Sequence, residues 1–345
     1  MTITDSPMRL SIVIPAHNEA ESLPILIDEI CKATSALHCS WELILIDDGS
    51  TDQTWAIIQS HAKEIPSLHG IRLRRNFGKA AALLAGIRAA QGEFVLTMDA
   101  DLQDVPAEIQ NFLNMLIDRY DVVSGWKKTR HDPWHKVWPS RVFNWMVSRL
   151  TGLHLHDHNC GMKLYRREVF KEIRLYGELH RFIPVLAHAR GFRIGELAIQ
   201  HRPRRFGRSK YGMERFARGF LDLLTVKFLT DFGYRPQHLL GFSGLLAFAV
   251  GLIGMLYLVV IWCLRLFQPE AHDPLHTRPL LLYSVASFLL GAQLMSMGLI
   301  AELIMANQNP TILPYSIAEE TASPSVDLQP EPDRLSSKGN EQRAG

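Results

Sequence analysis

Two long apolar segments toward the end of the sequence constrain this chain most. Residues 239–264 and 280–301 contain no charged side chain. As helices they would be about 39 and 33 Å long at about 1.5 Å per residue, and the hydrocarbon layer of a bilayer is roughly 30 Å thick. Only the short connector 265–279 separates them. The pattern therefore predicts a transmembrane helical hairpin whose two flanking regions lie on the same side of the membrane.

The distribution of charge indicates which side that is. Residues 201–235, just before the first apolar segment, hold nine Lys and Arg residues against three Asp and Glu residues, a net charge of +6. The connector has only two basic residues, Arg265 and Arg278. Because basic residues collect on the cytoplasmic side, we expect a multi-pass inner (plasma) membrane protein with its large domain in the cytoplasm. The net charge of the whole chain, +2, is too small to favour a nucleic-acid partner.

Apolar runs, polar turns and helical patterns alternate before this membrane region. The expected strands are residues 10–15, 41–46, 71–73, 93–98, 121–125 and 194–200, and the expected helices are residues 22–37, 79–90, 139–151 and 167–172. This alternation is typical of an α/β fold with a mostly parallel sheet and helices on both faces. Ligands of such sheets bind at the carboxyl ends of the strands. The polar turns that follow the strands ending at 15, 46 and 98 should therefore converge on one crevice.

The strand 93–98 ends on the most informative of these turns, Asp99-Ala100-Asp101. Two carboxylates that leave a strand through a tight turn can meet at one point, and carboxylate oxygens suit Mg²⁺ or Mn²⁺. Gln103 is a third candidate ligand. The alternative is that Asp99 and Asp101 cap a helix that begins near Pro106, because Asp is a good cap and Pro suits a first helical turn.

The chain divides into four regions on this basis. They are a cytosolic domain (1–212), a juxtamembrane amphipathic helix (213–235), two transmembrane helices (236–302) and a disordered cytoplasmic tail (316–345). Within the second region, residues 214–232 carry Phe216, Phe220, Leu223, Leu224 and Phe228 at helical spacing. Such a helix either lies on the membrane surface or packs on the domain.

Four motifs in order give the chain a family resemblance. They are Ser11 to Glu19 (SIVIPAHNE), Ile46 to Asp52 (IDDGSTD), Met98 to Asp104 (MDADLQD) and Arg204-x-x-Gly207-x-Ser209-Lys210. Together they resemble the family 2 glycosyltransferases, and more closely the dolichyl-phosphate mannosyltransferases and the bacterial polyprenyl-phosphate glycosyltransferases. The resemblance implies a GT-A-like (Rossmann-like) domain that transfers sugar from a UDP- or GDP-sugar to undecaprenyl or dolichyl phosphate.

The resemblance also implies roles for particular residues. Those expected to bind the nucleotide-sugar or phosphate groups are Pro15, His17, Glu19, Ile46, Asp48, Asp99, Ala100, Asp101, Lys127, Lys136, Ser140, Arg204 and Lys210. Asp99, Asp101 and Gln103 would hold the metal. Relatives usually carry arginine where this chain has Lys127 and Lys136, and lysine keeps the charge without the bidentate fork.

The implied reaction is the attack of a polyprenyl-phosphate oxygen on the anomeric carbon, with inversion and departure of the nucleoside diphosphate. Asp101 and Arg204 would stabilise the leaving group. Asp157 is a candidate base or acceptor-orienting residue; ordering of its own loop is the alternative.

Two other functions fit parts of the pattern. A processive polysaccharide synthase shares the metal motif, but it usually needs a Q-x-x-R-W signature and more membrane spans than this sequence offers. A non-catalytic scaffold that binds nucleotide-sugar is the other alternative. The sequence does not specify the sugar, the nucleotide or the lipid, and it leaves open whether the protein forms a homo-oligomer.

Overall fold

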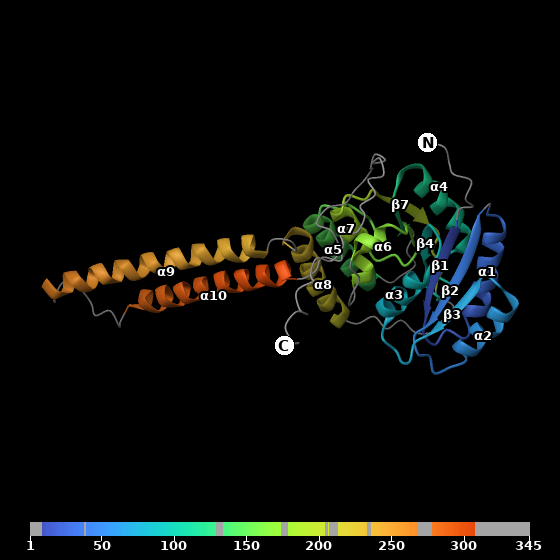
Figure 1. Ribbon diagram of the computed structural model, residues 1–345, viewed down its shortest axis with the longest axis horizontal. Helices are drawn as coiled ribbons and strands as arrows, with labels where there is room; N and C mark the ends of the chain where they lie inside the picture. Colours follow the sequence, from blue (N-terminus) through green and yellow to red (C-terminus); the bar gives the residue numbers. More distant parts are fainter. Residues whose placement is uncertain are drawn as a thin grey trace, which may run out of the picture.

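The computed structural model describes residues 9–37, 39–128, 134–173, 179–203, 206, 213–232, 236–267 and 278–307. It has two parts, a domain of sheet and helices and a helical hairpin that projects from it (Figure 1). The predicted tail, 316–345, lies outside the described residues, and the predicted division into four regions stays a prediction.

The domain is built on one seven-stranded sheet with the strand order β3-β2-β1-β4-β6-β5-β7. The strands are β1 (Arg9–Ala16), β2 (Ser40–Asp47), β3 (Leu68–Arg72), β4 (Phe94–Thr97), β5 (Val122–Lys127), β6 (Lys163–Arg166) and β7 (Ile194–Ile199). Strands β1 to β4 pair in parallel, and so do β5 and β7. The prediction of an α/β domain with a mostly parallel sheet is confirmed.

Strand β6 departs from the predicted pattern. It runs antiparallel between β4 and β5, and the sequence analysis placed no strand there. Its four residues, KLYR, include two charged side chains and are too short to show a period. The insertion matters for function, because it brings residues 157–162 beside the carboxyl end of β4. The Thr97 hydroxyl donates a hydrogen bond to the Gly161 carbonyl at 3.0 Å.

Helices cover both faces of the sheet because alternate residues of a strand point to opposite faces. Ile12 and Ile14 are fully buried in a core cluster with helix α1 (Leu23–Ser35), whereas Val13 belongs to a cluster with helix α3 (Lys79–Ala89). The remaining helices of the domain are α2 (Thr54–Glu64), α4 (Ile109–Arg119), α5 (Trp134–Thr151), α6 (Val169–Glu172) and α7 (Ile183–Ala189), with 3₁₀ turns η1 (Pro106–Glu108) and η2 (Leu179–Phe182).

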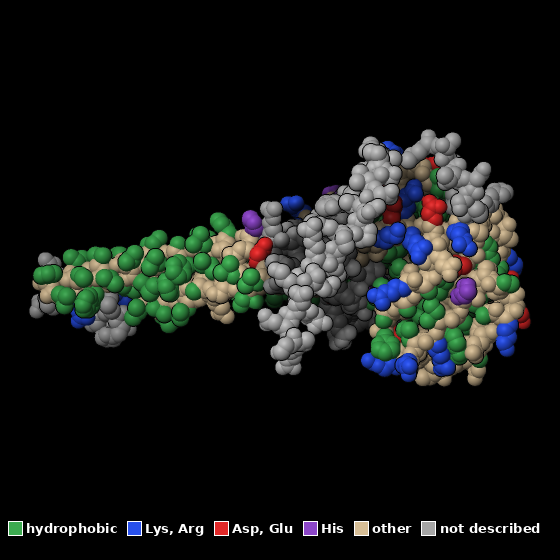
Figure 2. Space-filling model, viewed as in Figure 1, with side chains coloured by type: hydrophobic (Ala, Val, Ile, Leu, Met, Phe, Trp, Pro, Cys, Tyr) green, Lys and Arg blue, Asp and Glu red, His purple; other side chains and the backbone are tan. Residues whose placement is uncertain are grey.

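The hairpin consists of α9 (Pro236–Phe267) and α10 (Pro279–Asn307), both longer than predicted. Each is long and apolar enough to cross a membrane. On the face of the molecule seen in Figure 2, most coloured side chains of the hairpin are hydrophobic, whereas charged side chains are scattered over the domain. Glycines bring the two helices close together, since a Cβ on Gly251 would lie 2.4 Å from the Phe288 nitrogen. Small residues at such contacts are typical of helices that associate in lipid.

Helix α8 (Met213–Phe232) joins the two parts. Leu223 is fully buried in a cluster with Phe143 and Phe182, so one face of α8 packs on the domain. Phe220 and Phe228 are each 39% exposed. The predicted apolar residues of α8 therefore fall into two groups. Leu223 packs on the domain, as one alternative required, whereas Phe220 and Phe228 stay partly exposed, as a helix on the membrane surface requires.

Candidate active site

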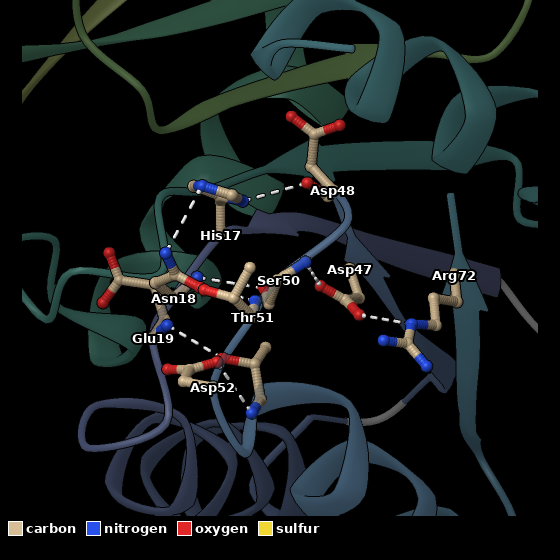
Figure 3. A network of polar contacts seen from close by, with 10 residues as sticks. His17, Asn18, Glu19, Asp47, Asp48, Ser50, Thr51, Asp52 and Arg72 are labelled. Carbon is tan, nitrogen blue, oxygen red and sulfur yellow. Dashed lines mark hydrogen bonds and ion pairs between the residues drawn. The ribbon is translucent and has the colours of Figure 1, made fainter. Parts of the chain in front are cut away.

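The turns that follow β1 and β2 are held together at the carboxyl edge of the sheet. The Asn18 amide donates to the Ser50 hydroxyl at 2.9 Å, and the Thr51 amide donates to the Asn18 side chain at 2.9 Å (Figure 3). The Glu19 amide donates to the Thr54 hydroxyl at the start of α2. Because adjacent parallel strands end at the same edge, this network fixes the predicted nucleotide-binding turns side by side.

Asp48 connects this network to the loop before α3. Its carboxylate accepts hydrogen bonds from the Phe77 amide at 2.7 Å and the Gly78 amide at 2.9 Å. Its carbonyl oxygen lies 2.9 Å from His17 Nδ1. Gly49 adopts φ +64°, and a Cβ there would lie 2.4 Å from the carbonyl carbon of Arg75. The carboxylate of Asp48 is therefore engaged with main-chain amides, and it shapes the loop that leads into α3.

The acidic turn after β4 has a different environment. The Asp99 carboxylate forms an ion pair with Lys79 at the start of α3. The Asp101 carboxylate accepts a hydrogen bond from the Gln103 amide at 3.2 Å. Leu102, between them, has φ +61°, a left-handed conformation that is rare for leucine. The chain turns sharply here, as the D-x-D pattern predicted.

The helix-cap alternative for this turn is wrong. The first helical turn does begin at Pro106, but Val105 occupies its N-cap position and no side chain caps it. Neither Asp99 nor Asp101 therefore caps this helical turn. Gly161 lies directly against Asp99, since a Cβ at this glycine would be 2.6 Å from the Asp99 carboxyl carbon. The carboxylate therefore contacts both Gly161 and Lys79 while its side chain stays 29% exposed.

The pKa values of two carboxyl groups in this turn, the partly exposed Asp99 and the buried Asp104, shift in opposite directions. Burial raises the pKa of Asp99, but the charge and hydrogen bond of Lys79 outweigh it and lower the pKa to about 2. Burial raises the pKa of Asp104 to about 6, against the attraction of Lys127, and the charges of Asp99 and Asp101 add to the rise. Asp104 is 1% exposed, and neither carboxylate oxygen has a hydrogen-bond partner among the described residues.

Lys127 faces this acidic turn from the end of β5. Its Nζ lies 3.5 Å from Asp104 Oδ1. Burial lowers the pKa of Lys127. The negative charge of Asp104 raises it, and the charges of Asp99 and Asp157 add to this rise. The net effect is a raised pKa, so Lys127 is a cation. Two lysines, Lys79 and Lys127, thus pair with two carboxylates of the acidic turn, Asp99 and Asp104.

Comparisons with known proteins identify the family. The model for "Glycosyl transferase family 2" matches residues 11–174. The dodecaprenyl-phosphate galacturonate synthase of Rhizobium johnstonii is 38% identical over 302 residues, which cover 86% of this chain and 88% of that protein. The chain belongs to glycosyl transferase family 2. The undecaprenyl-phosphate 4-deoxy-4-formamido-L-arabinose transferase of Yersinia pestis (strain Pestoides F) is 36% identical over 308 residues, 88% of this chain and 90% of that protein.

Solved structures confirm the fold of this family 2 glycosyltransferase. Mannosyl-3-phosphoglycerate synthase from Rubrobacter xylanophilus superposes with a TM-score of 0.53 at 16% identity, over 64% of this chain and 74% of that one. Glucosyl-3-phosphoglycerate synthase from Mycobacterium tuberculosis, in complex with Mn²⁺, UDP and phosphoglyceric acid, gives 0.51 at 18% identity, over 65% and 78%. The GT-A-like expectation is confirmed, and the protein is an enzyme, a glycosyltransferase.

Several other predicted site residues of this glycosyltransferase lie at the same edge. Asp157 is 2% exposed; its amide donates to Glu196 at 2.9 Å and its carboxylate accepts from the Asn159 amide at 3.1 Å. Asp157 therefore orders its own turn, as the alternative reading held, and its charge also reaches Lys127. Ile46 is fully buried in the core and Ala100 is 4% exposed, so any contact of theirs with a nucleotide must come from the main chain.

Gln103 links the acidic turn to the basic segment that begins at residue 201. Its carbonyl accepts a hydrogen bond from the Arg202 amide at 2.9 Å. Arg204 and Lys210 lie outside the described residues. Lys136 lies in α5, where its side chain is not described, and Ser140 is a half-buried residue of the same helix. The roles of all four remain predictions.

Sequence reasoning gave no role to Lys79 or Asp104. A signal for Lys79 was present, because a lysine in the first turn of a helix opposes the helix dipole and so points to some other task for that charge. Asp104 stood in a quoted motif, but its burial could not be foreseen, since Asp is mostly exposed.

Proposed function

We propose that this glycosyltransferase moves a sugar from a UDP- or GDP-sugar to the phosphate of a polyprenyl lipid at the membrane surface. The observation that carries the proposal is the acidic turn 99–104 with its two lysines, set in a domain that is joined through α8 to an apolar hairpin. Both named relatives are polyprenyl-phosphate sugar enzymes, and each matches most of this chain, hairpin included.

The acidic turn fits a divalent cation, Mg²⁺ or Mn²⁺. Asp99 is ionised at any physiological pH because its pKa is about 2. Within the described residues no group of three or more His, Cys, Asp or Glu side chains is arranged around one point, so the protein would supply only Asp99, Asp101 and Gln103. Such sparse ligation suits a metal that completes its coordination with substrate oxygens. When bound, the cation would neutralise charge that develops on the leaving diphosphate.

The chain's own residues would do the rest. Pro15, His17 and Glu19 would border the nucleotide, and Asp48 holds the 77–78 loop at the same edge of the sheet. Lys127, with Lys136, Ser140, Arg204 and Lys210, supplies groups that bind the phosphates of donor and acceptor. Fixed positive charge aimed at a developing anion is the largest contribution of many active sites.

The acceptor needs little activation. A polyprenyl phosphate is an anion near neutral pH, so its oxygen attacks the anomeric carbon directly and the configuration inverts. Asp157 would orient the acceptor or the loop that contacts it. The helices α9 and α10 would span the inner membrane with the domain in the cytoplasm, and this anchor would keep the domain at the membrane surface, where the lipid phosphate lies.

Transfer of radiolabelled sugar in detergent tests this function. The purified protein is incubated with each of a panel of UDP- and GDP-sugars, undecaprenyl phosphate and Mn²⁺ or Mg²⁺, with Asp101→Ala as the control. We expect a lipid product that carries one sugar and that requires both the metal and Asp101. A product with many sugars would indicate a processive synthase instead, and folded protein that binds donor without any product would indicate a scaffold.

A further inference from the structure

Lys79 is a charged residue of the candidate site to which neither the motif pattern nor the steps of the proposed reaction assign a role. It is the first residue of α3, and its ammonium pairs with Asp99 Oδ1. The two side chains are only partly exposed, 36% for Lys79 and 29% for Asp99. An ammonium at the amino end of a helix is repelled by the helix dipole. Its position therefore depends on the carboxylate that it faces.

The Asp99 carboxylate already has two close neighbours. Gly161 lies against the carboxylate, since a Cβ there would be 2.6 Å from the carboxyl carbon, and the Lys79 ammonium pairs with Oδ1. A divalent cation on Asp99 would stand beside the ammonium, and like charges this close repel strongly in a partly buried site. One cation must withdraw when the other binds.

We propose that Lys79 is a resident counter-cation of Asp99, which the divalent metal displaces, and that the displaced ammonium then binds the diphosphate of the donor. The inference rests on the proposed function and deepens it. Lys79 is well placed for both positions. It begins at the amino end of α3, where main-chain N–H groups also favour an anion, and its side chain reaches Asp99 from there.

This arrangement couples the two ligands. A nucleoside diphosphate attracts Lys79 away from Asp99 and so favours the metal, and the metal releases Lys79 for the diphosphate. By linkage the two effects are equal in size. Before either ligand binds, the ion pair with Lys79 holds the Asp99 carboxylate in place.

The binding of Mn²⁺ alone tests the first step. The full-length protein in detergent is titrated with Mn²⁺, and the free ion is measured by electron paramagnetic resonance. We expect Lys79→Gln to bind Mn²⁺ about fivefold more tightly than the wild type, the lower end of the range for coupled sites, because the competing cation is gone. Lys79→Arg keeps the charge and should bind Mn²⁺ like the wild type.

A matched control is available on α1. Lys32 pairs with Asp28 at 2.6 Å, and both side chains are exposed, 74% and 61%. Lys32→Gln removes the same kind of charge from the same kind of pair, so it controls for the change in net charge and should leave Mn²⁺ affinity unchanged. Equal or weaker Mn²⁺ binding by Lys79→Gln would overturn the inference, as would the absence of Mn²⁺ binding to any of the proteins.

The second step is read with UDP and GDP. In the wild type the nucleotide should raise Mn²⁺ affinity by a larger factor than in Lys79→Gln, because only the wild type gains from the transfer of Lys79. A purely structural lysine would lower the melting temperature of Lys79→Gln and change neither Mn²⁺ affinity nor this factor. If neither nucleotide binds the wild type, the proposed donor is wrong, whereas the titration with Mn²⁺ alone still decides whether Lys79 competes.

Discussion

The turn after β2 and the turn after β4 are both rich in aspartate, yet they use their carboxylates in opposite ways. In the first turn the carboxylates bind the protein itself: Asp47 accepts from the Ser50 amide at 2.8 Å, and Asp48 accepts from two amides of the loop before α3. In the second turn Asp101 accepts a hydrogen bond from one main-chain amide, that of Gln103, whereas Asp99 faces a lysine and Asp104 has no hydrogen-bond partner among the described residues. The first turn shapes the site, and the second holds its charge.

The difference shows that an aspartate in a polar turn at a sheet edge is not by itself evidence of a catalytic or ligand-binding role. A carboxylate saturated by main-chain amides is stabilised where it is, and a ligand would have to displace those bonds. A carboxylate balanced by a lysine side chain can exchange that partner for another cation. Substitutions in the two turns should therefore separate stability from turnover.

Asp101→Asn should give the largest effect. The amide side chain keeps an oxygen that can accept from the Gln103 amide, so the turn should survive, but the charge is lost. We expect turnover to fall by about 100-fold or more, the scale for loss of one group that stabilises a developing charge, with little change in melting temperature. Near-normal turnover would show that the second turn does not carry the reactive charge.

Asp48→Asn should act mainly on stability. Asparagine offers only one acceptor oxygen where the Phe77 and Gly78 amides need two, and its own amide would face one of those donors. We expect a loss of about 1–3 kcal/mol in the free energy of unfolding, the scale for an unsatisfied buried group, and a rise in donor KM that exceeds the fall in kcat. Unchanged stability with abolished turnover would make Asp48 a ligand of the reacting groups instead.

A pair of glycine substitutions sharpens the comparison at smaller scale. Gly161→Ala would place a methyl group 2.6 Å from the Asp99 carboxylate, and the carboxylate must turn away. We expect turnover to fall by about tenfold, or about 1.4 kcal/mol, with a modest change in melting temperature.

Gly152→Ala is the matched control for that change. A Cβ at Gly152 meets nothing within 4 Å, but its φ of +76° strains any side chain. This variant should lower the melting temperature and leave turnover unchanged. If the two variants behave alike, the effect of Gly161→Ala is a general loss of stability and not a displacement of Asp99.

Much of this arrangement follows from the sequence because the decisive signals are local. The apolar runs that end in polar turns predicted β1, β2 and β4, and the uncharged segments predicted the two apolar helices α9 and α10. Strand β6 was missed because its four residues include Lys163 and Arg166, and its pairing with β4 depends on partners almost 70 residues away.

The site was predicted less completely than the fold for a similar reason. The D-x-D turn could be read from adjacent residues, whereas the contact between Lys79 and Asp99 depends on how α3 packs beside β1 and on where β4 ends. Asp48 was correctly placed at the sheet edge, but its engagement with the Phe77 and Gly78 amides required the path of a loop 29 residues away. Sequence patterns predict where on the fold a charged side chain lies, and the packing of distant segments determines which groups it contacts.

Asp121→Asn should have the smallest effect of these substitutions. It should lower the melting temperature slightly and leave turnover unchanged. Asp121 precedes β5, away from the carboxyl edge, and it resembles Asp48 because its carboxylate accepts from the Arg193 amide at 2.8 Å and the Arg193 side chain at 3.0 Å. Burial raises the pKa of Asp121. These hydrogen bonds and the nearby arginine charges lower it by more, so the pKa lies below the ordinary value for aspartate. We expect the melting temperature to fall by a few degrees at pH 7.

The pH dependence of that difference tests the cause. A carboxyl group with a lowered folded-state pKa stabilises the fold above its unfolded pKa of about 3.9, and the stabilisation is lost as the pH falls through the folded value. The gap between wild type and Asp121→Asn should therefore be constant from pH 7 to about pH 5 and close below about pH 4. A gap that persists in acid would mean that shape, not charge, holds Arg193. In that case Asp121 would not be an example of a carboxylate whose charge supports the fold. The contrast with carboxylates that bind a ligand would then depend only on the turns after β2 and β4.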